Sequence, residues 1–252
     1  MFKYIFVLLL SCILVACSGK TPVQPVEPFD AEKSFAKANR HMDEKDYDEA
    51  RALLLEIKNR DLSKKFGPLA QLRIANSYVQ DEEPERGVAE FKQFLEMYPD
   101  HKHAPYAQYQ IAMVYFHQIE SPERGYSGAA RALVEFQKLK EDYPRNPYKE
   151  QIELRMTRCR NIMGDYEFLV GEFYQKKEAY PAAISRYEYL IKNFPEYKGM
   201  AAALLNLGIS YKQSGELEKA VTSFNRLSRE YPDTPQTVQA KKELSSLKPD
   251  KE

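Results

Sequence analysis

Histidines and cysteines are the residues of this chain most capable of chemistry, and their spacing predicts no catalytic or metal site. His101 and His103 lie in a connection between two expected helices, without a nearby cysteine and without the HExxH pair that seats zinc. No GxGxxG, P-loop or GxSxG pattern is present, so nothing predicts a phosphate cradle or a serine nucleophile. Acidic pairs fall on helix faces where solvated carboxylates are usual. We therefore expect no enzymatic activity, no metal and no other cofactor.

The three cysteines have different expected roles. Cys12 lies inside an N-terminal apolar run, Cys17 follows that run directly, and Cys159 lies on the apolar stripe of an expected helix. A thiol on such a stripe is expected to be buried and inert. If Cys12 is removed by cleavage and Cys17 is acylated, Cys159 has no partner, and no internal disulfide is expected.

Residues 1–16 have the features of a secretory signal peptide. Lys3 precedes an apolar run of about a dozen residues, which is too short to cross a bilayer as a helix. The run ends in Leu14-Val15-Ala16-Cys17, which resembles the lipobox of bacterial lipoproteins. That resemblance implies a mature chain that begins at a lipidated Cys17, and Ser18 after it implies sorting to the periplasmic face of the outer membrane. The alternative is an ordinary signal peptide in which Cys17 is incidental.

Residues 17–29 are expected to form a tether. Pro22, Pro25 and Pro28 recur at every third residue, which favours extended polyproline II. A docking motif remains the alternative. Lysine plus arginine equal aspartate plus glutamate at 37 each, so the basic excess of a nucleic-acid-binding protein is missing and attachment to a membrane by charge alone is not expected.

One pattern of residue spacing recurs along the rest of the chain, and the stretch from Leu204 to Pro232 shows it most clearly. From Tyr211 the steps to Ala220, Phe224 and Pro232 are 9, 4 and 8 residues (220−211, 224−220, 232−224). The same steps start at Tyr174 and at Tyr78, and a small residue precedes each tyrosine by three positions. Apolar and small residues at these intervals on both sides of a turn predict tetratricopeptide helix pairs of about 34 residues each.

The fold class that follows is all-α, a superhelical tetratricopeptide-repeat solenoid of about five helix pairs plus a C-terminal capping helix, over residues 30–247. A tail, 248–252, follows. In the capping helix, Val238, Leu244 and Leu247 are expected on the inner side. The turn 119–127 is eight residues longer than the others, and either marks a binding face or is plain length drift. Besides the repeat 204–232, the helices are expected at 30–43, 46–59, 66–80, 84–97, 104–118, 128–142, 147–177 and 235–247.

The long helix 147–177 carries Arg155, Arg158 and Arg160 in its first half. This half extends beyond a normal repeat helix and needs something to pack against. A solvated basic face and a partner-docking surface are both compatible with the sequence.

The same helix and its successor resemble the BamD family, lipoproteins of the bacterial outer-membrane β-barrel assembly machinery. The resemblance covers the whole chain and is most specific over 159–194, which includes Cys159-Arg160-Asn161-Ile162-Met163-Gly164 and the Glu-Phe-x-Val-Gly-x-Phe-Tyr run that starts at Glu167. It implies a non-enzymatic scaffold that binds the periplasmic domains of the central barrel subunit, unfolded barrel clients and other assembly lipoproteins. The family commonly carries a docking arginine near Ile162, so Arg160 or Arg158 is implied to supply that charge. The expected partner-binding residues are Arg155, Arg158, Arg160 and Glu167.

A curved stack of helix pairs presents a concave wall made by the first helix of each pair. An extended client segment could bind this wall through shape and polar contacts. The side chains expected to form the client groove are Gln71, Asn76, Gln108 and Tyr109.

Two other functions compete with assembly. A periplasmic repeat scaffold that coordinates peptidoglycan synthesis with envelope constriction would share the repeats, but such proteins usually carry a coiled coil and no lipobox. A peptidoglycan hydrolase would need a nucleophile or metal constellation that the sequence does not show.

Overall fold

The structure is a computed structural model that describes residues 29–61 and 64–247, and every regular element in these ranges is helical. Five antiparallel helix pairs and a terminal helix confirm the predicted all-α repeat solenoid. The eight helices whose bounds are predicted above differ from the observed ones by at most two residues at either end. The signal peptide 1–16, Cys17, the tether up to residue 28 and the tail 248–252 lie outside the described residues. The elements are α2 (Ala31–Asp43), α3 (Tyr47–Arg60), α4 (Gly67–Gln80), α5 (Pro84–Met97), α6 (Ala104–His117), η1 (Pro122–Arg124), α7 (Ser127–Asp142), α8 (Lys149–Lys176), α9 (Tyr180–Asn193), α10 (Met200–Gln213), α11 (Leu217–Glu230) and α12 (Pro235–Leu247).

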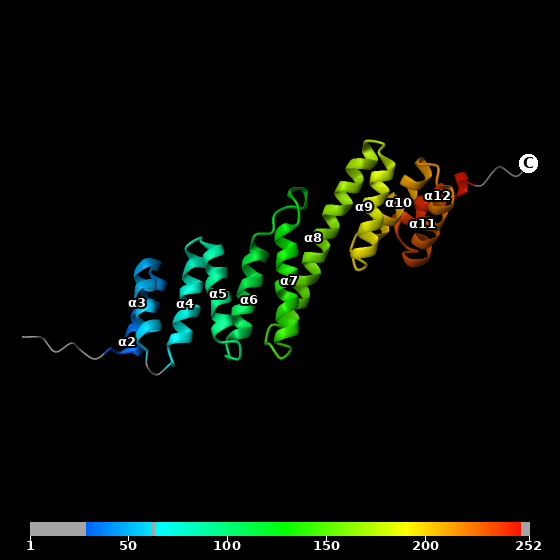
Figure 1. The fold of residues 1–252 in the computed structure, drawn as a ribbon. Coiled ribbons are helices and arrows are strands. Elements are labelled where there is room, and N and C mark those ends of the chain that lie inside the picture. Colours follow the sequence, from blue (N-terminus) through cyan, green and yellow to red (C-terminus); the bar gives the residue numbers. More distant parts are fainter. Residues whose placement is uncertain (1–28, 62–63, 248–252) are drawn as a thin grey trace, which may run out of the picture.

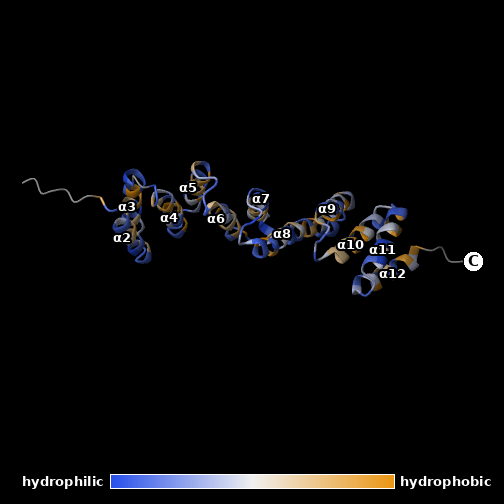
Figure 2. Ribbon diagram, turned by 90° about the horizontal axis from the view of Figure 1, so that it is seen from below, coloured by the Kyte–Doolittle hydropathy of each residue, from blue (hydrophilic) through white to orange (hydrophobic). Residues whose placement is uncertain are grey.

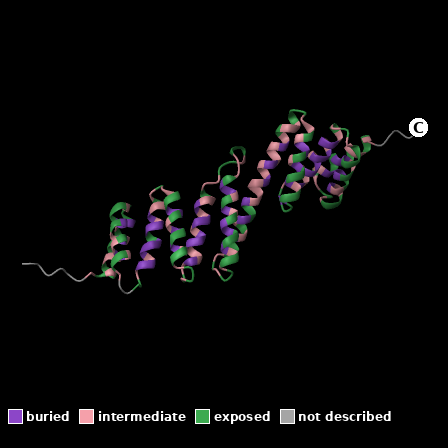
Figure 3. Cartoon of the chain, viewed as in Figure 1, coloured by how far each residue is buried: buried purple, intermediate pink, exposed green. Residues whose placement is uncertain are grey.

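The helix pairs stand side by side and form an elongated stack (Figure 1). Seen from below, first helices and second helices of the pairs lie in two layers (Figure 2). Apolar side chains meet between these layers in four successive clusters, while the outer faces and turns are exposed (Figure 3). Each helix pair therefore buries apolar side chains both between its own two helices and against the neighbouring pairs, as expected of a solenoid.

Small residues allow the two helices of a pair to approach closely. An added Cβ at Gly171 would lie 2.5 Å from Cε1 of Tyr187, and one at Gly208 would lie 2.4 Å from Cε1 of Phe224. Both rings are fully buried. In these two pairs the small residue three positions before the repeat tyrosine is therefore the point where the two helices approach closely.

The turns within four of the five pairs share a left-handed residue at one repeat position. It follows the repeat tyrosine, or His41 in the first pair, by four residues (45−41, 82−78, 178−174, 215−211). Three of the four residues carry a side chain: Lys45 (φ 61°), Glu82 (φ 60°) and Glu178 (φ 58°), against Gly215 (φ 84°). Only the last pair has the residue type that favours this conformation.

The 28 residues of α8 belong to two cores. Ile152, Met156 and Cys159 pack with α6 and α7, whereas Phe168 and Tyr174 pack with α9 to α11. The first half of α8 therefore completes the third helix pair, and the second half is the first helix of the fourth pair. The first half of α8, which was expected to need a packing partner, packs against α7.

The terminal helix α12 caps the stack with a different face from the one predicted. Leu244 and Leu247 are partly buried against the last core, as expected, but Val238 is 58% exposed. Thr237 and Ala240 are buried in its place, because their three-residue spacing puts them on the same face as Leu244. The assignment of Val238 to the capping side is therefore wrong.

The long turn before α7 folds onto α8. It contains η1, and the ring of Tyr126 meets the ring of Tyr166 edge to face, with centroids 5.0 Å apart. Gly125, with φ 110°, precedes Tyr126 and turns the chain toward α7. Among the described residues, no helix combines the length and the apolar character that crossing a bilayer demands.

Candidate partner-binding surfaces

Arg155 and Arg158 of α8 lie over aromatic rings of α6. The guanidinium carbon of Arg155 is 5.7 Å from the ring centroid of Tyr109 and 5.8 Å from that of Phe116. Arg158 lies 5.3 Å from Phe116 and is exposed. At these distances a guanidinium is attracted by the ring face, so the basic side chains are oriented rather than freely solvated.

Arg160 lies on another face of the same helix. It lines a hollow of about 420 Å³ with Glu153, Thr157 and the α9–α10 turn. It also borders a second hollow, of about 360 Å³, against Leu133 and Val134 of α7. The three arginines therefore form two surfaces, and the single basic cluster suggested by the sequence is wrong.

Glu167, the fourth expected partner-binding residue, is inside the α8–α9 pair. Its side chain is only 2% exposed, and its carboxylate accepts a hydrogen bond from Nη1 of Arg186 at 3.2 Å. The carboxylate therefore faces a partner within the chain, and the interpretation of Glu167 as a surface residue is wrong.

Gln71 and Gln108 are also buried between the helices of their pairs. The Gln71 amide donates to the carboxylate of Glu90 at 2.6 Å, and the Gln108 amide donates to that of Glu135 at 2.9 Å. Both amides also donate to the main-chain oxygen of the same glutamate. Their predicted exposure in an open groove is wrong.

These polar pairs occupy one repeat position, which sequence reasoning missed. Gln71 and Gln108 lie seven residues before Tyr78 and Tyr115, as Glu167 lies seven before Tyr174 (78−71, 115−108, 174−167). Each partner directly precedes the buried aromatic residue of the second helix: Glu90, Glu135 and Arg186. The recurrence was visible in the sequence, and it indicates an internal polar contact within three successive pairs.

Asn76 and Tyr109, the other two expected groove residues, contribute to contacts between helices. The Tyr106 hydroxyl donates to Oδ1 of Asn76 at 2.9 Å and joins α6 to α4. Tyr109 is 9% exposed, stacks on Tyr148 with centroids 4.2 Å apart, and donates its hydroxyl to Gln151 at 3.2 Å. Asn76 is therefore partly accessible to a binding partner, whereas Tyr109 exposes only a small part of its ring.

One accessible surface along α6 and the start of α8 consists of aromatic rings and guanidinium groups, and we name it the aromatic strip. It comprises Tyr106, Phe116, Tyr148, Arg155 and Arg158, with Tyr109 as its buried floor. Sequence reasoning missed the first three, although aromatic residues on a repeat's first helix were the available signal. Such a surface offers ring faces and positive charge to an extended peptide.

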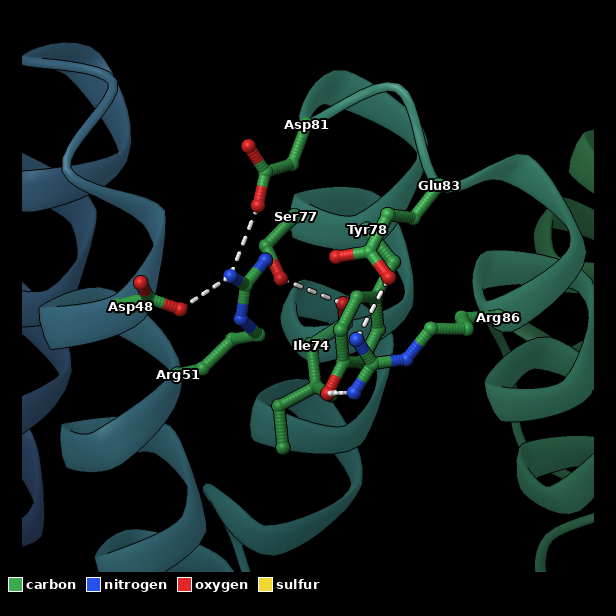
Figure 4. A network of polar contacts seen from close by, with 8 residues as sticks. All are labelled: Asp48, Arg51, Ile74, Ser77, Tyr78, Asp81, Glu83 and Arg86. Atoms are coloured by element: carbon green, nitrogen blue, oxygen red, sulfur yellow. Dashed lines mark hydrogen bonds and ion pairs between the residues drawn. The ribbon is translucent and has the colours of Figure 1, made fainter.

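A second polar network, also missed, joins the first helix pair to the second (Figure 4). Nη2 of Arg51 donates to Asp48 at 2.5 Å and to Asp81 at 2.8 Å, although Arg51 is only 7% exposed. The guanidinium groups of Arg51 and Arg86 both lie against the ring of Tyr78, at 4.6 and 4.1 Å from its centroid. The arrangement fixes α3 on α4 and has the geometry of a structural contact.

The histidines do not gather metal ligands. The main-chain N–H of His103 donates to Nδ1 of His101 at 3.2 Å, and burial lowers the pKa of His101. Within 29–61 and 64–247, no group of three or more histidine, cysteine, aspartate or glutamate residues could hold a metal ion.

The chain is similar to a family of outer membrane proteins and to solved repeat structures. Residues 29–223 match the family model YfiO, described as an outer membrane lipoprotein. "Outer membrane protein assembly factor BamD" of Neisseria meningitidis serogroup A is 24% identical over 247 residues, covering 92% of each chain. The protein of the same name from Xylella fastidiosa strain Temecula1 is 25% identical over 243 residues, covering 91% of this chain and 82% of its own. Among solved structures, the TPR2AB-domain:pHSP90-complex of yeast Sti1 has a TM-score of 0.46 and 15% identity, covering 86% of this chain and 84% of that one.

Proposed function

This chain belongs to the YfiO family of outer membrane lipoproteins, and from that premise we propose that it is a lipid-anchored scaffold of outer-membrane β-barrel assembly. In this role it binds the periplasmic domains of the central barrel subunit and unfolded barrel clients. The observation that carries the proposal is the similarity to proteins named outer membrane protein assembly factor BamD, which extends over about nine tenths of both chains in the Neisseria relative. The anchor is Cys17, at the periplasmic face of the outer membrane.

The first half of α8 offers the docking surface for the central subunit. Arg160 borders two hollows, one of which is also lined by the exposed side chain of Val134. A folded partner domain can place acidic side chains against the guanidinium group of Arg160 and apolar atoms against Val134. Such a combination of charge and apolar contact is typical of protein interfaces rich in arginine.

The aromatic strip offers the client surface. An unfolded barrel segment is extended and alternates apolar and polar side chains, so ring faces and guanidinium groups can serve both kinds. This assignment replaces Gln71 and Gln108, whose side chains are occupied inside the helix pairs, and keeps Asn76 at the edge of the strip.

Affinity capture of the full chain from detergent-solubilised outer membrane tests the docking proposal. We expect recovery of an integral β-barrel protein that carries several periplasmic domains. Arg160→Glu should reduce that recovery, because the substitution reverses the charge of the proposed surface. Arg229→Glu is the matched control, since Arg229 is 77% exposed on α11, away from α8.

The same experiment separates the competing functions. Septal or peptidoglycan-synthesising enzymes in place of the barrel protein would support a scaffold of envelope constriction. Equal loss with Arg229→Glu would show that general charge, and not the α8 surface, determines capture. For the client surface, Arg155→Ala should weaken binding of an extended barrel-strand peptide measured by fluorescence anisotropy, whereas Lys192→Ala, an exposed residue of α9, should not.

A further inference from the structure

Two arms of the solenoid meet within α8. The N-terminal arm comprises α2 to α7 and the first half of α8, and the C-terminal arm comprises the second half of α8 with α9 to α12. Their buried cores are separate clusters, and Met163 is the partly buried residue that packs against both. Within the described chain, α8 therefore carries the connection between the arms (Figure 1).

Gly164 lies in α8 at the place where the two cores separate. A glycine inside a helix lowers helix stability by about 1 kcal/mol relative to alanine. The close approach of Tyr197 explains why a glycine is needed, because an added Cβ would lie 2.6 Å from Cδ2 of its ring. The helix that joins the arms thus carries a residue of low helix propensity at the junction, where bending would change the angle between them.

Two contacts span this position from different sides of the helix. Tyr126, from the long α6–α7 turn of the N-terminal arm, reaches past Gly164 and packs edge to face on Tyr166. From the C-terminal arm, the main-chain N–H of Lys198 in the α9–α10 turn reaches back and donates to Oδ1 of Asn161 at 2.9 Å. Asn161 and Tyr166 are five residues apart, which separates them by about 140° around a helix of 3.6 residues per turn.

We propose that the long α6–α7 turn and the α9–α10 turn brace α8 across Gly164 and so fix the angle between the two arms. Each brace ties one arm to the half of α8 that belongs to the other arm. A bend of α8 in either direction would open the Tyr126–Tyr166 contact or the Lys198–Asn161 hydrogen bond. The extra residues of the long turn then have a mechanical role. This role differs from both interpretations that the sequence offered, a binding face and plain length drift.

The braces hold the arms in one geometry before any partner binds. A partner that contacts both arms would then meet a surface that is already arranged, and less conformational entropy would be lost on binding. The inference goes beyond the proposed function, because it concerns the free chain and holds whichever partner the surfaces bind.

Distance measurement between the arms tests the proposal on the full chain in detergent. Ketone-bearing amino acids at the exposed positions Ala89 on α5 and Asn225 on α11 accept nitroxide labels without modifying Cys17 or Cys159. Pulsed electron paramagnetic resonance then reports the distribution of distances between the labels. Tyr126→Ala and Asn161→Ala should each broaden the distribution and shift its mean, and the double variant should do so more strongly.

Matched variants keep the test decisive. Phe173→Ala removes an aromatic side chain of α8 that is 56% exposed and whose ring lies against that of its neighbour Tyr174, so it should leave the distribution unchanged. Tyr126→Phe keeps the ring and should also behave like the unsubstituted chain, with helical content by circular dichroism verifying that each variant folds. An unchanged distribution in the folded double variant would overturn the proposal, as would equal broadening in Phe173→Ala.

Discussion

At the residue scale, the buried polar pairs distinguish the second, third and fourth helix pairs from the last. Gln71 with Glu90, Gln108 with Glu135 and Glu167 with Arg186 fill one repeat position. In the last pair the same position holds Leu204 and Ser223, both buried. A polar group is costly to bury without a hydrogen-bond partner, so each of the three contacts favours one alignment of its two helices.

The Glu167–Arg186 pair gives the first prediction. Arg186→Met should leave the Glu167 carboxylate buried without this partner and lower the free energy of unfolding by up to about 3 kcal/mol, whereas Glu167→Gln, which keeps shape and hydrogen bonding, should lower it by about 1 kcal/mol. Urea unfolding followed by circular dichroism measures both. A surface docking role for Glu167 alone predicts instead that unfolding is unchanged in Glu167→Gln while partner capture is lost.

Cys159 gives a prediction of pH dependence. Burial raises the pKa of the Cys159 thiol from 9.0 to about 11, since the thiolate would be formed among apolar side chains. The raised pKa means that the folded state retains the thiol proton after the unfolded chain has released it. The contribution of the Cys159 thiol to the free energy of unfolding is therefore fully present below pH 9. As the pH rises toward 11, the free energy of unfolding falls by up to about 2–3 kcal/mol.

Urea unfolding at pH 8 and near pH 10.5 measures that loss. Cys159→Ala should show a smaller fall in the free energy of unfolding between the two pH values, because its side chain does not titrate. Burial also raises the pKa of Tyr187 and Tyr197, and their contributions remain in both chains as a common background. Identical pH dependence of the two chains would contradict the assignment to Cys159.

At the element scale, the left-handed turn residue offers a stabilising substitution. Glu178 has φ 58° in the α8–α9 turn, where a side chain costs about 1–2 kcal/mol relative to the right-handed conformation. Glu178→Gly should raise the free energy of unfolding by at most about 1 kcal/mol, because glycine loses part of the gain through its greater freedom in the unfolded chain. Urea midpoints measure the effect. Gly215→Glu, the reverse change at the equivalent position, should lower the midpoint, and equal midpoints would contradict the conformational argument.

The elements were largely predictable because their signal is local. The spacing of small, aromatic and proline residues places Gly208 opposite Phe224 and Gly171 opposite Tyr187, and steric contact demands that spacing wherever two helices cross. Val238 was misassigned because apolar character alone does not give its angle around α12. The positions of Thr237 and Ala240 do give it, but neither residue is a bulky apolar side chain of the kind that marks a buried face in a sequence.

The candidate site was less predictable because its contacts join distant segments. Amphipathic reasoning puts glutamine and glutamate on the solvent side, so it assigned Gln71, Gln108 and Glu167 to surfaces that they do not occupy. Whether such a residue is buried depends on a hydrogen-bond partner on the next helix. The pattern of one helix alone does not show that partner. The docking of Arg155 and Arg158 on Phe116 likewise requires the relative position of α6 and α8.

At the scale of the whole molecule, stability is distributed along the stack. Each helix pair contacts its neighbours, and the apolar core is divided into four clusters along the chain. In such a solenoid a local destabilisation affects its own cluster and its neighbours before it affects the far end. The consequence of a substitution therefore depends on whether its side chain belongs to one cluster or to two.

Met163 and Gly208 separate these two cases. Met163 packs against the cores of both arms, so Met163→Ala should lower amide protection from hydrogen exchange in α6 and α7 as well as in α9 and α10. Its cost should lie below the about 2–5 kcal/mol of a fully buried methionine, since it is only partly buried. Gly208→Ala forces a Cβ against Phe224 and should cost about 1–3 kcal/mol by overpacking, with the loss of protection confined to α9 to α12. Mass spectrometry of exchanged peptides measures both patterns. Loss of protection in α6 and α7 caused by Gly208→Ala would mean that the arms unfold as a single cooperative unit, and α8 would then transmit stability between the arms rather than only join them.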